Sequence, residues 1–364
     1  MSGATPTRVD QIIPSIVEHD AVSNHAFNVQ RLLQEMGYLS TIYALVLGPG
    51  VEGRVRPLGE FRSEGGTGHW VIYQSSIGSP AAEVFAQHSG IKLLDYHNIT
   101  PAEFVERWIP PLGEETRLGR TQLAKLAPIV DFAIADSAYN ASELRDCGYR
   151  YAEVVPVLVA AGAITDKPDA ATIDRFDSQP GHDWLFVGQL APHKAQHEII
   201  MAFARYRALY DHNARLHLVG REMGSAYREA LRRFIEKIGL GDSITLTGSV
   251  TTSELAAYYE LCDVFVCLSN HEGFCAPIAE AMARGLPVVA YGAAAVPDTV
   301  GDAGIVLSQK DPDFVASVVH ELFMKPELIE ALKSRGRIRA ATFTLESAEE
   351  AFRSAFAMAT SLLA

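Results

Sequence analysis

Residues 269–280 form the run Ser269-Asn270-His271-Glu272-Gly273-Phe274-Cys275-Ala276-Pro277-Ile278-Ala279-Glu280, which follows an apolar run from Asp263 to Leu268. The apolar run predicts a buried strand, and Pro277 predicts that a helix begins directly after the turn. Gly273 is expected to supply the tight turn itself. Glu272 then lies in the turn and Glu280 about one helical turn inside the helix. Both carboxylates can face one ligand whose phosphates meet the free N–H groups at the helix start.

Apolar segments alternate with amphipathic ones along the whole chain, which is typical of parallel sheets with helices on both faces. In the first half we expect helices at about 25–36 and 139–146, each ending before a glycine. The expected strands are 10–13, 40–45, 70–73, 91–96, 132–135 and 153–157, then 184–187, 215–219, 244–246, 264–268, 288–290 and 305–307. The pattern predicts an α/β protein with two doubly wound units, whose ligands bind beyond the carboxyl ends of the strands.

A chain of 364 residues exceeds the size at which one hydrophobic core keeps growing, so two domains are expected. From 159 to 181 there is no long apolar run, which indicates a linker. We therefore expect an N-terminal Rossmann-like domain at 1–160, a linker at 161–181 and a second Rossmann-like domain at 182–344. The remaining segment, 345–364, has a helical pattern.

Composition excludes several classes of function. The net charge of −13 disfavours nucleic acid as a partner, because phosphate neutralisation needs a basic surface. There is no apolar stretch long enough to span a membrane and no signal-like N-terminus, so a cytoplasmic protein is expected. The four cysteines form neither a C-x2-C pair nor a dense framework, which favours free thiols over disulfides or zinc. His193 and His197 lack a third metal ligand, and no P-loop or dinucleotide fingerprint is present, so no metal or cofactor is expected.

The run from Ser269 to Glu280 resembles the E-x7-E signature of retaining GT-B glycosyltransferases, most closely glycosyltransferase family 4, the group 1 transferases. The resemblance implies two Rossmann-like domains facing a central cleft, with the C-terminal helix packing back on the first. It further implies metal-independent, retaining transfer of a hexose from a GDP- or UDP-linked donor to an acceptor hydroxyl. Glu272 would contact hydroxyls of the donor sugar and Glu280 the ribose. Gly273, Phe274 and Cys275 would belong to the same donor-binding turn.

A second match is Phe186-Val187-Gly188-Gln189-Leu190-Ala191-Pro192-His193-Lys194, which is similar to the family's V-G-R-x-x-P-x-K string. Lys194 would clamp the donor diphosphate, where an ammonium neutralises charge that grows as the sugar–phosphate bond breaks. Gln189 stands where the family usually has arginine, and a neutral amide cannot replace a guanidinium. Arg221, after the next predicted strand, is the candidate to take that role; the alternative is a solvated loop cation.

The run Leu94-Asp95-Tyr96-His97-Asn98-Ile99-Thr100-Pro101 looks like the D-Y-H-N-I-T-P string of a family 4 subgroup. By this resemblance, His97 would lie beside the transferred sugar, hydrogen-bond one of its hydroxyls and orient its reacting face. A histidine at a strand end is, taken alone, more often structural.

Two weaker matches complete the predicted site. In Asp20-Ala21-Val22-Ser23-Asn24-His25, Ser23 replaces a glycine that the subgroup usually has; Ser23, Asn24 and His25 would close over the diphosphate or touch the acceptor. Alternatively, the serine or asparagine only caps a helix. In Leu246-Thr247-Gly248-Ser249-Val250, the backbone at Gly248 and Val250 would flank the nucleobase.

The resemblance leaves the acceptor open between a glycan, a lipid-linked molecule and a small molecule, and it leaves open a peripheral contact with the inner face of a membrane. The oligomeric state is likewise open. Two other functions compete with the transferase. Gln189 motivates a catalytically weak nucleotide-sugar-binding subunit or sensor. A GT-B nucleotide-sugar epimerase or a glycogen-type phosphorylase would share the architecture.

Overall fold

The computed structural model describes residues 6–17, 20–63, 66, 68–158, 166–176 and 180–363. The chain divides into two compact units, which are described separately. The first unit contains residues 1–106, 110–160 and 345–364, and the second contains 107–109 and 161–344. Among the residues described, no helix is both long and apolar enough to cross a membrane.

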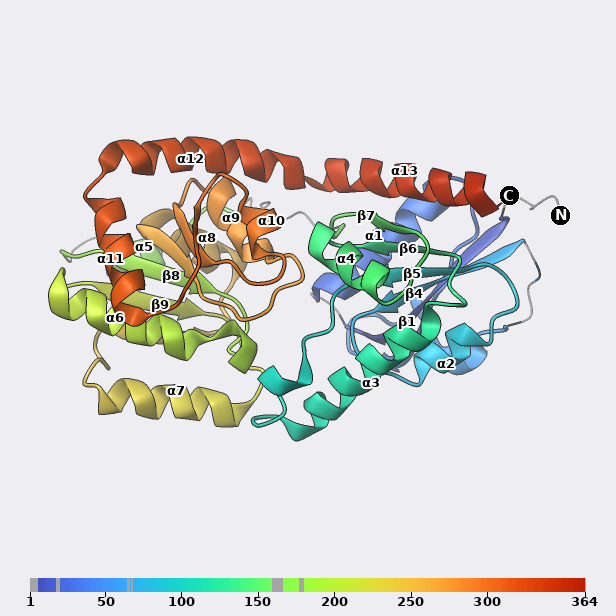
Figure 1. Cartoon of the computed structure of the whole chain (residues 1–364), viewed down its shortest axis with the longest axis horizontal. Helices are drawn as coiled ribbons and strands as arrows, with labels where there is room; N and C mark the ends of the chain where they lie inside the picture. Colours follow the sequence, from blue (N-terminus) through green and yellow to red (C-terminus); the bar gives the residue numbers. More distant parts are fainter. Residues whose placement is uncertain are drawn as a thin grey trace. The chain divides into compact units, whose positions relative to one another are not determined.

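The first unit is built on a seven-stranded parallel sheet in the order β3-β2-β1-β4-β5-β6-β7. Figure 1 labels β1, β4, β5, β6 and β7 of this sheet. Its strands are β1 (Arg8–Ile16), β2 (Ile42–Leu47), β3 (Val55–Pro57), β4 (His69–Ser75), β5 (Lys92–Tyr96), β6 (Phe132–Ala135) and β7 (Ala152–Val154). Its helices are α1 (Ala21–Glu35), α2 (Ala81–Ala86), α3 (Pro110–Leu126), α4 (Ala138–Asp146) and α13 (Leu345–Leu363), with 3-10 turns η1 (Leu58–Glu60) and η2 (Ala102–Phe104).

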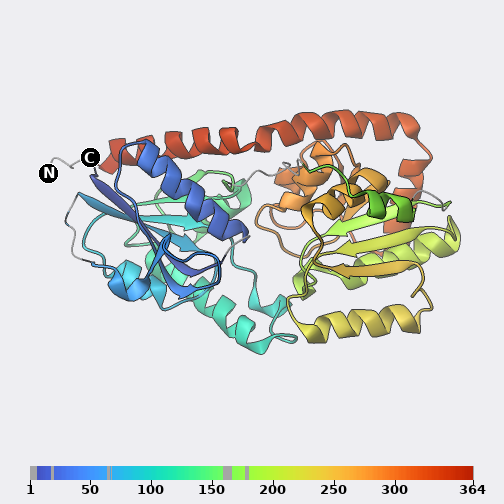
Figure 2. The same ribbon diagram turned by 180° about the vertical axis from the view of Figure 1, so that it is seen from behind.

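Helices cover both faces of this sheet because both faces are apolar. On one face, α1 and α13 pack side by side (Figure 2), and Phe356 lies on Trp70 with ring centroids 5.7 Å apart. On the other face, α2, α3 and α4 pack on strand residues, and Phe85 stacks on Tyr73. The C-terminal helix is thus part of the core of the first unit.

The second unit has a six-stranded parallel sheet in the order β10-β9-β8-β11-β12-β13. Its strands are β8 (Asp183–Val187), β9 (Arg215–Val219), β10 (Ile244–Gly248), β11 (Val264–Cys267), β12 (Val288–Tyr291) and β13 (Ile305–Leu307). Its helices are α5 (Ala170–Phe176), α6 (Gln196–Leu209), α7 (Ser225–Lys237), α8 (Thr252–Leu261), α9 (Ala276–Ala283), α10 (Val296–Val300), α11 (Pro312–Phe323) and α12 (Pro326–Ala340), with η3 (Pro192–Lys194) and η4 (Ala341–Phe343).

The predicted α/β class with two doubly wound sheets is confirmed. Every expected strand is present, and β3 is an additional edge strand that the sequence pattern did not indicate. Of the expected linker 161–181, residues 161–165 and 177–179 lie outside the described residues. The part between them contains α5, which packs against α8. Residues 107–109 also join the second unit, where Trp108 contacts Tyr227 edge to face at 5.2 Å.

Candidate active site

In the second unit, the loops after β8, β9 and β10 are joined by backbone hydrogen bonds. The Leu190 N–H donates to the Arg221 carbonyl at 2.9 Å, and the Gly220 N–H donates to the Gly248 carbonyl at 3.1 Å. Gly220 has a φ of +142°, and a Cβ there would lie 2.1 Å from the carbonyl oxygen of Gly188. Only glycine permits this approach. The three sheet-edge loops therefore form one connected backbone surface.

Gln189 and Arg221 contact each other on this surface. With the amide oxygen of Gln189 facing Arg221, it accepts hydrogen bonds from Nε at 3.2 Å and Nη2 at 2.9 Å. A guanidinium is therefore present beside the position where the family usually has arginine, supplied by the neighbouring loop. Arg221 is exposed, so its remaining N–H groups are accessible to a ligand.

Lys194 and Glu272 form a close ion pair between the β8 loop and the β11 loop. The Lys194 Nζ lies 2.7 Å from Oε1 and 2.6 Å from Oε2 of Glu272. The lysine side chain is 20% exposed and the glutamate 6% exposed. Burial disfavours the charged lysine, but the adjacent carboxylate outweighs it and raises the pKa of Lys194. The sequence-predicted phosphate clamp and sugar ligand are thus in direct contact.

The turn that carries Glu272 has its left-handed residue at Cys275, not at Gly273. Cys275 has a φ of +69° at the N-cap of α9, whereas Gly273 is not among the positive-φ residues. Gly273 lies in the bend between β11 and α9, as expected, but the left-handed position of the turn is at Cys275. Neighbouring groups hold the turn: the Phe274 carbonyl accepts from the Thr299 hydroxyl, and the Glu272 carbonyl accepts from the Ala295 N–H at 3.2 Å.

Glu280 lies in the second turn of α9, as predicted, and it is half-buried. Its Oε2 accepts a hydrogen bond of 2.7 Å from the hydroxyl of Tyr259 on α8. Burial raises the pKa of Glu280, and the hydrogen bond from Tyr259 only partly opposes this. Val250, after β10, is partly buried and packs against the core of the second unit.

In the first unit, both ring nitrogens of His97 face hydrogen-bond acceptors. Its Nδ1 lies 3.1 Å from both carboxylate oxygens of Asp136, and its Nε2 lies 2.5 Å from the Gln74 amide oxygen. The orientation of Gln74 follows from a relay: Gln11 donates to the Ala26 carbonyl at 2.9 Å, so its amide oxygen accepts from Gln74 Nε2 at 2.9 Å. His97 must then donate from both nitrogens, which only the imidazolium does.

The electrostatics agree with this reading. The side chain of His97 is 1% exposed, and burial disfavours its charge. The carboxylates of Asp136 and Asp95 outweigh burial and raise the pKa of His97 to about 9, with a smaller effect of Asp20. Asp95 Oδ1 lies 3.7 Å from His97 Nε2. Both N–H groups of His97 are therefore engaged within the first unit, and a sugar hydroxyl would have to displace Gln74 or Asp136 to reach one.

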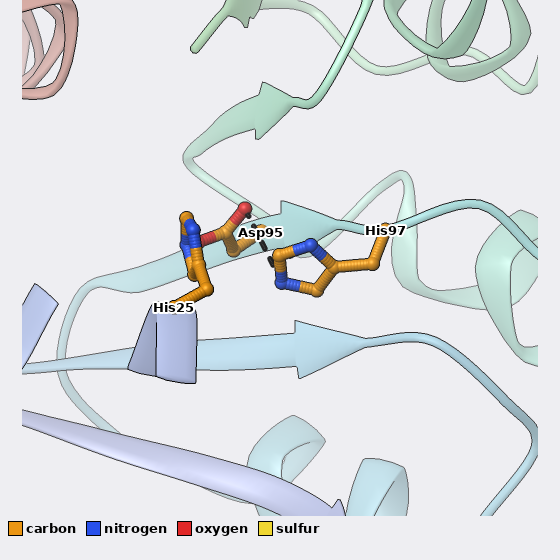
Figure 3. A group of neighbouring side chains, drawn as sticks. All are labelled: His25, Asp95 and His97. Carbon is orange, nitrogen blue, oxygen red and sulfur yellow. Dashed lines mark hydrogen bonds and ion pairs between the residues drawn. The ribbon is translucent and has the colours of Figure 1, made fainter. Parts of the chain in front are cut away.

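His25 lies on the other side of Asp95 (Figure 3) and is fully buried. Its Nδ1 accepts the Leu158 N–H at 2.8 Å, so the proton is on Nε2, which donates to Asp95 Oδ2 at 2.7 Å. His25, Asp95 and His97 are close enough to suggest a metal site. These hydrogen bonds leave no free lone pair on the nitrogen that His25 or His97 would offer, so the arrangement does not fit one.

The sequence predicts that the helix begins at about residue 25 and that the run 20–25 precedes it. In the structure this run is instead the N-cap and first turn of α1, which begins four residues earlier than predicted. Asp20 is its N-cap and accepts from the backbone N–H and the hydroxyl of Ser23, each at 3.1 Å. Ser23 and His25 are buried and hydrogen-bonded, which gives them structural roles. Asn24 is exposed.

Sequence reasoning missed the partners of His97. Gln74, Asp95 and Asp136 lie in or directly after β4, β5 and β6, which are neighbours in the sheet. Polar residues at the carboxyl ends of adjacent parallel strands were the signal that could have found them.

Comparison with known proteins supports the architecture and the motifs. Residues 177–339 match the family model "Glycosyl transferases group 1". A GDP-mannose-dependent alpha-(1-6)-phosphatidylinositol monomannoside mannosyltransferase of Mycobacterium tuberculosis is 34% identical over 160 residues, which cover 42% of this chain and 40% of that protein. The enzyme of the same name from Mycolicibacterium smegmatis is 31% identical over 233 residues, 60% of each chain. A D-inositol 3-phosphate glycosyltransferase of Thermobifida fusca is 30% identical over 182 residues, 47% of this chain and 41% of that protein.

The chain thus spans about 40% of the length of the M. tuberculosis relative. Among solved structures, Anabaena HepE in complex with UDP-glucose has a TM-score of 0.74 at 16% identity, covering 96% of this chain and 99% of that one. Sucrose-phosphate synthase of Thermosynechococcus elongatus has a TM-score of 0.70 at 17% identity, covering 96% and 100%. The family match assigns residues 177–339 to the group 1 glycosyltransferases, glycosyltransferase family 4, and the similarity to solved structures shows that the chain has the GT-B fold.

Proposed function

We propose that this chain is a retaining, metal-independent hexosyltransferase that moves a sugar from a nucleotide-sugar donor to an acceptor hydroxyl. The observation that carries the proposal is the contact between Lys194 and Glu272, which joins two sheet-edge loops inside the family segment. Glu280 and the guanidinium of Arg221 belong to the same segment. These groups offer a cation for phosphate, carboxylates for hydroxyls and a second cation at the loop surface.

In the proposed reaction, the bond from the anomeric carbon to the diphosphate oxygen breaks, and the acceptor oxygen bonds to the same face of that carbon. The acceptor's proton passes to the departing phosphate oxygen, so no protein base is needed. Lys194 stabilises the negative charge that develops on the diphosphate. When Lys194 turns toward phosphate, Glu272 is released to accept hydrogen bonds from the sugar hydroxyls.

Glu280 is proposed to bind the ribose of the donor. Its Oε2 accepts a hydrogen bond from Tyr259, and within the described part of the chain no donor contacts its other carboxylate oxygen. Phe274, Cys275 and the backbone at Gly248 and Val250 are proposed to complete the donor site.

We propose that the positive charge of His97 acts on the donor sugar. The exposed Asn24 is proposed to contact the diphosphate or the acceptor. The donor is proposed to be GDP- or UDP-linked, since one group of relatives is named for GDP-mannose and one solved neighbour holds UDP-glucose. The acceptor is proposed to be a lipid-linked or small polyol molecule, as the names of the relatives indicate. A lipid-linked acceptor would bring the protein to a membrane surface.

A panel of nucleotide sugars tests the proposal. GDP-mannose, UDP-glucose and UDP-N-acetylglucosamine are each incubated with the protein, and release of the free nucleotide is measured over time. A transferase should hydrolyse one donor slowly in the absence of acceptor and rapidly with it. Tight binding of a donor without turnover would instead support the nucleotide-sugar-binding subunit or sensor, and interconversion of the donor would support the epimerase.

Replacement of Glu280 by glutamine should weaken donor binding by about tenfold, because a charge-assisted hydrogen bond to the ribose becomes a neutral one. Isothermal titration with the active donor measures this effect. Glu260→Gln, on the exposed side of α8, is the matched control and should bind like the wild type. If Glu280→Gln and Glu260→Gln bound the donor with equal affinity, the proposed contact between Glu280 and the ribose would be contradicted.

Arg221→Ala should also lower donor affinity by about tenfold, since it removes a cation that we place beside the diphosphate. Gln189→Arg in that background should restore affinity, because the new guanidinium occupies the same place. In the wild-type background the same change should bring no gain, since it sets two guanidiniums against each other. Identical effects of Gln189→Arg in both backgrounds would show that Arg221 acts elsewhere.

A further inference from the structure

Three potential metal ligands meet between the last residue of β11 and the N-cap of α9. The thiols of Cys267 and Cys275 and a carboxylate oxygen of Glu272 all lie within 4.8 Å of one another. The exposed fractions of the three residues are 0%, 7% and 6%. They belong to one short segment with the spacing C-x4-E-x2-C, so the local backbone conformation alone brings them together.

We propose that Cys267, Glu272 and Cys275 form a binding site for a thiophilic divalent cation of the Zn²⁺ type. Two thiolates and one carboxylate are ligands that select Zn²⁺ over Mg²⁺ or Ca²⁺, which prefer oxygen alone. Three protein ligands leave one position of a tetrahedral site for water or another small ligand. The proposed cation takes no part in sugar transfer, which we propose to be metal-independent.

The charges around the turn favour such a cation. When it binds, both thiols lose their protons, and the charges of the two thiolates, the Glu272 carboxylate, the Lys194 ammonium and the cation sum to zero. A neutral cluster avoids the large penalty of an unbalanced buried charge. The dipolar groups nearby also fit, since the Ser269 hydroxyl lies 3.3 Å from the Cys267 sulfur and can donate to its thiolate.

Lys194 need not leave Glu272 when the cation binds. The lysine contacts both carboxylate oxygens, so one oxygen can turn to the cation while the other keeps the hydrogen bond. A partner that hydrogen-bonds a ligating carboxylate orients it and commonly changes metal affinity by about 10–100-fold. Lys194 would have this positioning role in the cation-bound form.

A functional consequence follows, and it rests on the proposed function. A Glu272 oxygen that ligates a cation cannot accept hydrogen bonds from the donor sugar. Cation and donor should therefore compete: Zn²⁺ should raise the apparent KM for the donor and leave kcat unchanged at saturating donor. A chelator should reverse the effect.

The binding test uses Co²⁺ on the full chain, without donor and with a phosphine reductant that keeps the thiols reduced. A thiolate-to-cobalt charge-transfer band should appear and saturate at one equivalent, and Zn²⁺ should abolish it. Cys267→Ser and Cys275→Ser should each weaken Co²⁺ binding by about tenfold or more. Cys147→Ser and Cys262→Ser, which change cysteines outside the cluster, should bind Co²⁺ like the wild type.

Glu272→Gln provides a second route if a serine variant fails to fold, and it should also weaken Co²⁺ binding. The proposal is overturned if no charge-transfer band forms, or if Cys267→Ser keeps the wild-type band and affinity. Failure of the proposed function looks different: chelator-treated protein would then turn over none of the donors, while the cobalt band and its dependence on Cys267 would be intact. Inhibition by Zn²⁺ that persists in Cys267→Ser would also overturn the competition at this site.

Discussion

Lys194→Ala should lower turnover by about 10²–10³-fold, because the variant loses the cation that stabilises charge on the departing diphosphate. Donor affinity should fall much less, since that charge is larger in the transition state than in the bound donor. Steady-state kinetics with the donor found by the nucleotide-sugar panel separates kcat from KM. Lys237→Ala, an exposed lysine on α7, is the control and should match the wild type.

The same variant has a predictable effect on folding that must be separated from catalysis. Without Lys194, Glu272 becomes a nearly buried carboxylate that has lost its only ion-pair partner among the described residues, which is strongly destabilising. The double variant Lys194→Ala/Glu272→Gln removes that unpaired charge and should recover much of the lost stability without recovering turnover. A rise in KM at unchanged kcat in the single variant would contradict the role of Lys194 at the transition state.

The stability of the protein should fall as pH rises through the pKa of His97. That pKa is about 9 in the folded protein and about 6.5 in an unfolded chain. A raised folded pKa gives a contribution that is fully present below about pH 6.5 and is lost as pH rises through about pH 9. The contribution should amount to about 3 kcal/mol, since each pKa unit corresponds to about 1.4 kcal/mol.

Urea unfolding between pH 6 and pH 10 measures this loss, and His97→Gln is the reference in which it should be absent. The titratable groups that face the ring are Asp136, Asp95, His25 and, more distantly, Asp20, so their variants test the cause. Asp136→Asn should lower the pKa of His97, as followed by NMR of the labelled imidazole. A His97 pKa that remained near its usual value in the wild type would contradict the imidazolium derived from the hydrogen-bond relay.

Features that depend on near neighbours in sequence were predictable from sequence alone. Apolar runs such as Val264–Cys267 gave the strands, because a strand buried on both faces needs a continuous apolar segment. The spacing of Glu272 and Glu280 placed one in the turn and one in the helix, which the structure shows. The start of α1 was misjudged because Asp20 caps it, and any of several polar residues in that run could have done so.

Tertiary structure alone decided which of these side chains meet. The sequence showed Lys194 and Glu272 as two separate motifs, and only the adjacency of β8 and β11 brings them into contact. The imidazolium of His97 depends on Gln11, Gln74 and Asp136, which lie on or directly after different strands of one sheet. Strand order and register set such contacts, and the short-range periodicity of a sequence carries no record of them. The proximity of Cys267 and Cys275 was also not predictable from the sequence. The backbone at Cys275 is left-handed, a conformation that cysteine rarely adopts, and it helps to shape the segment in which both thiols meet.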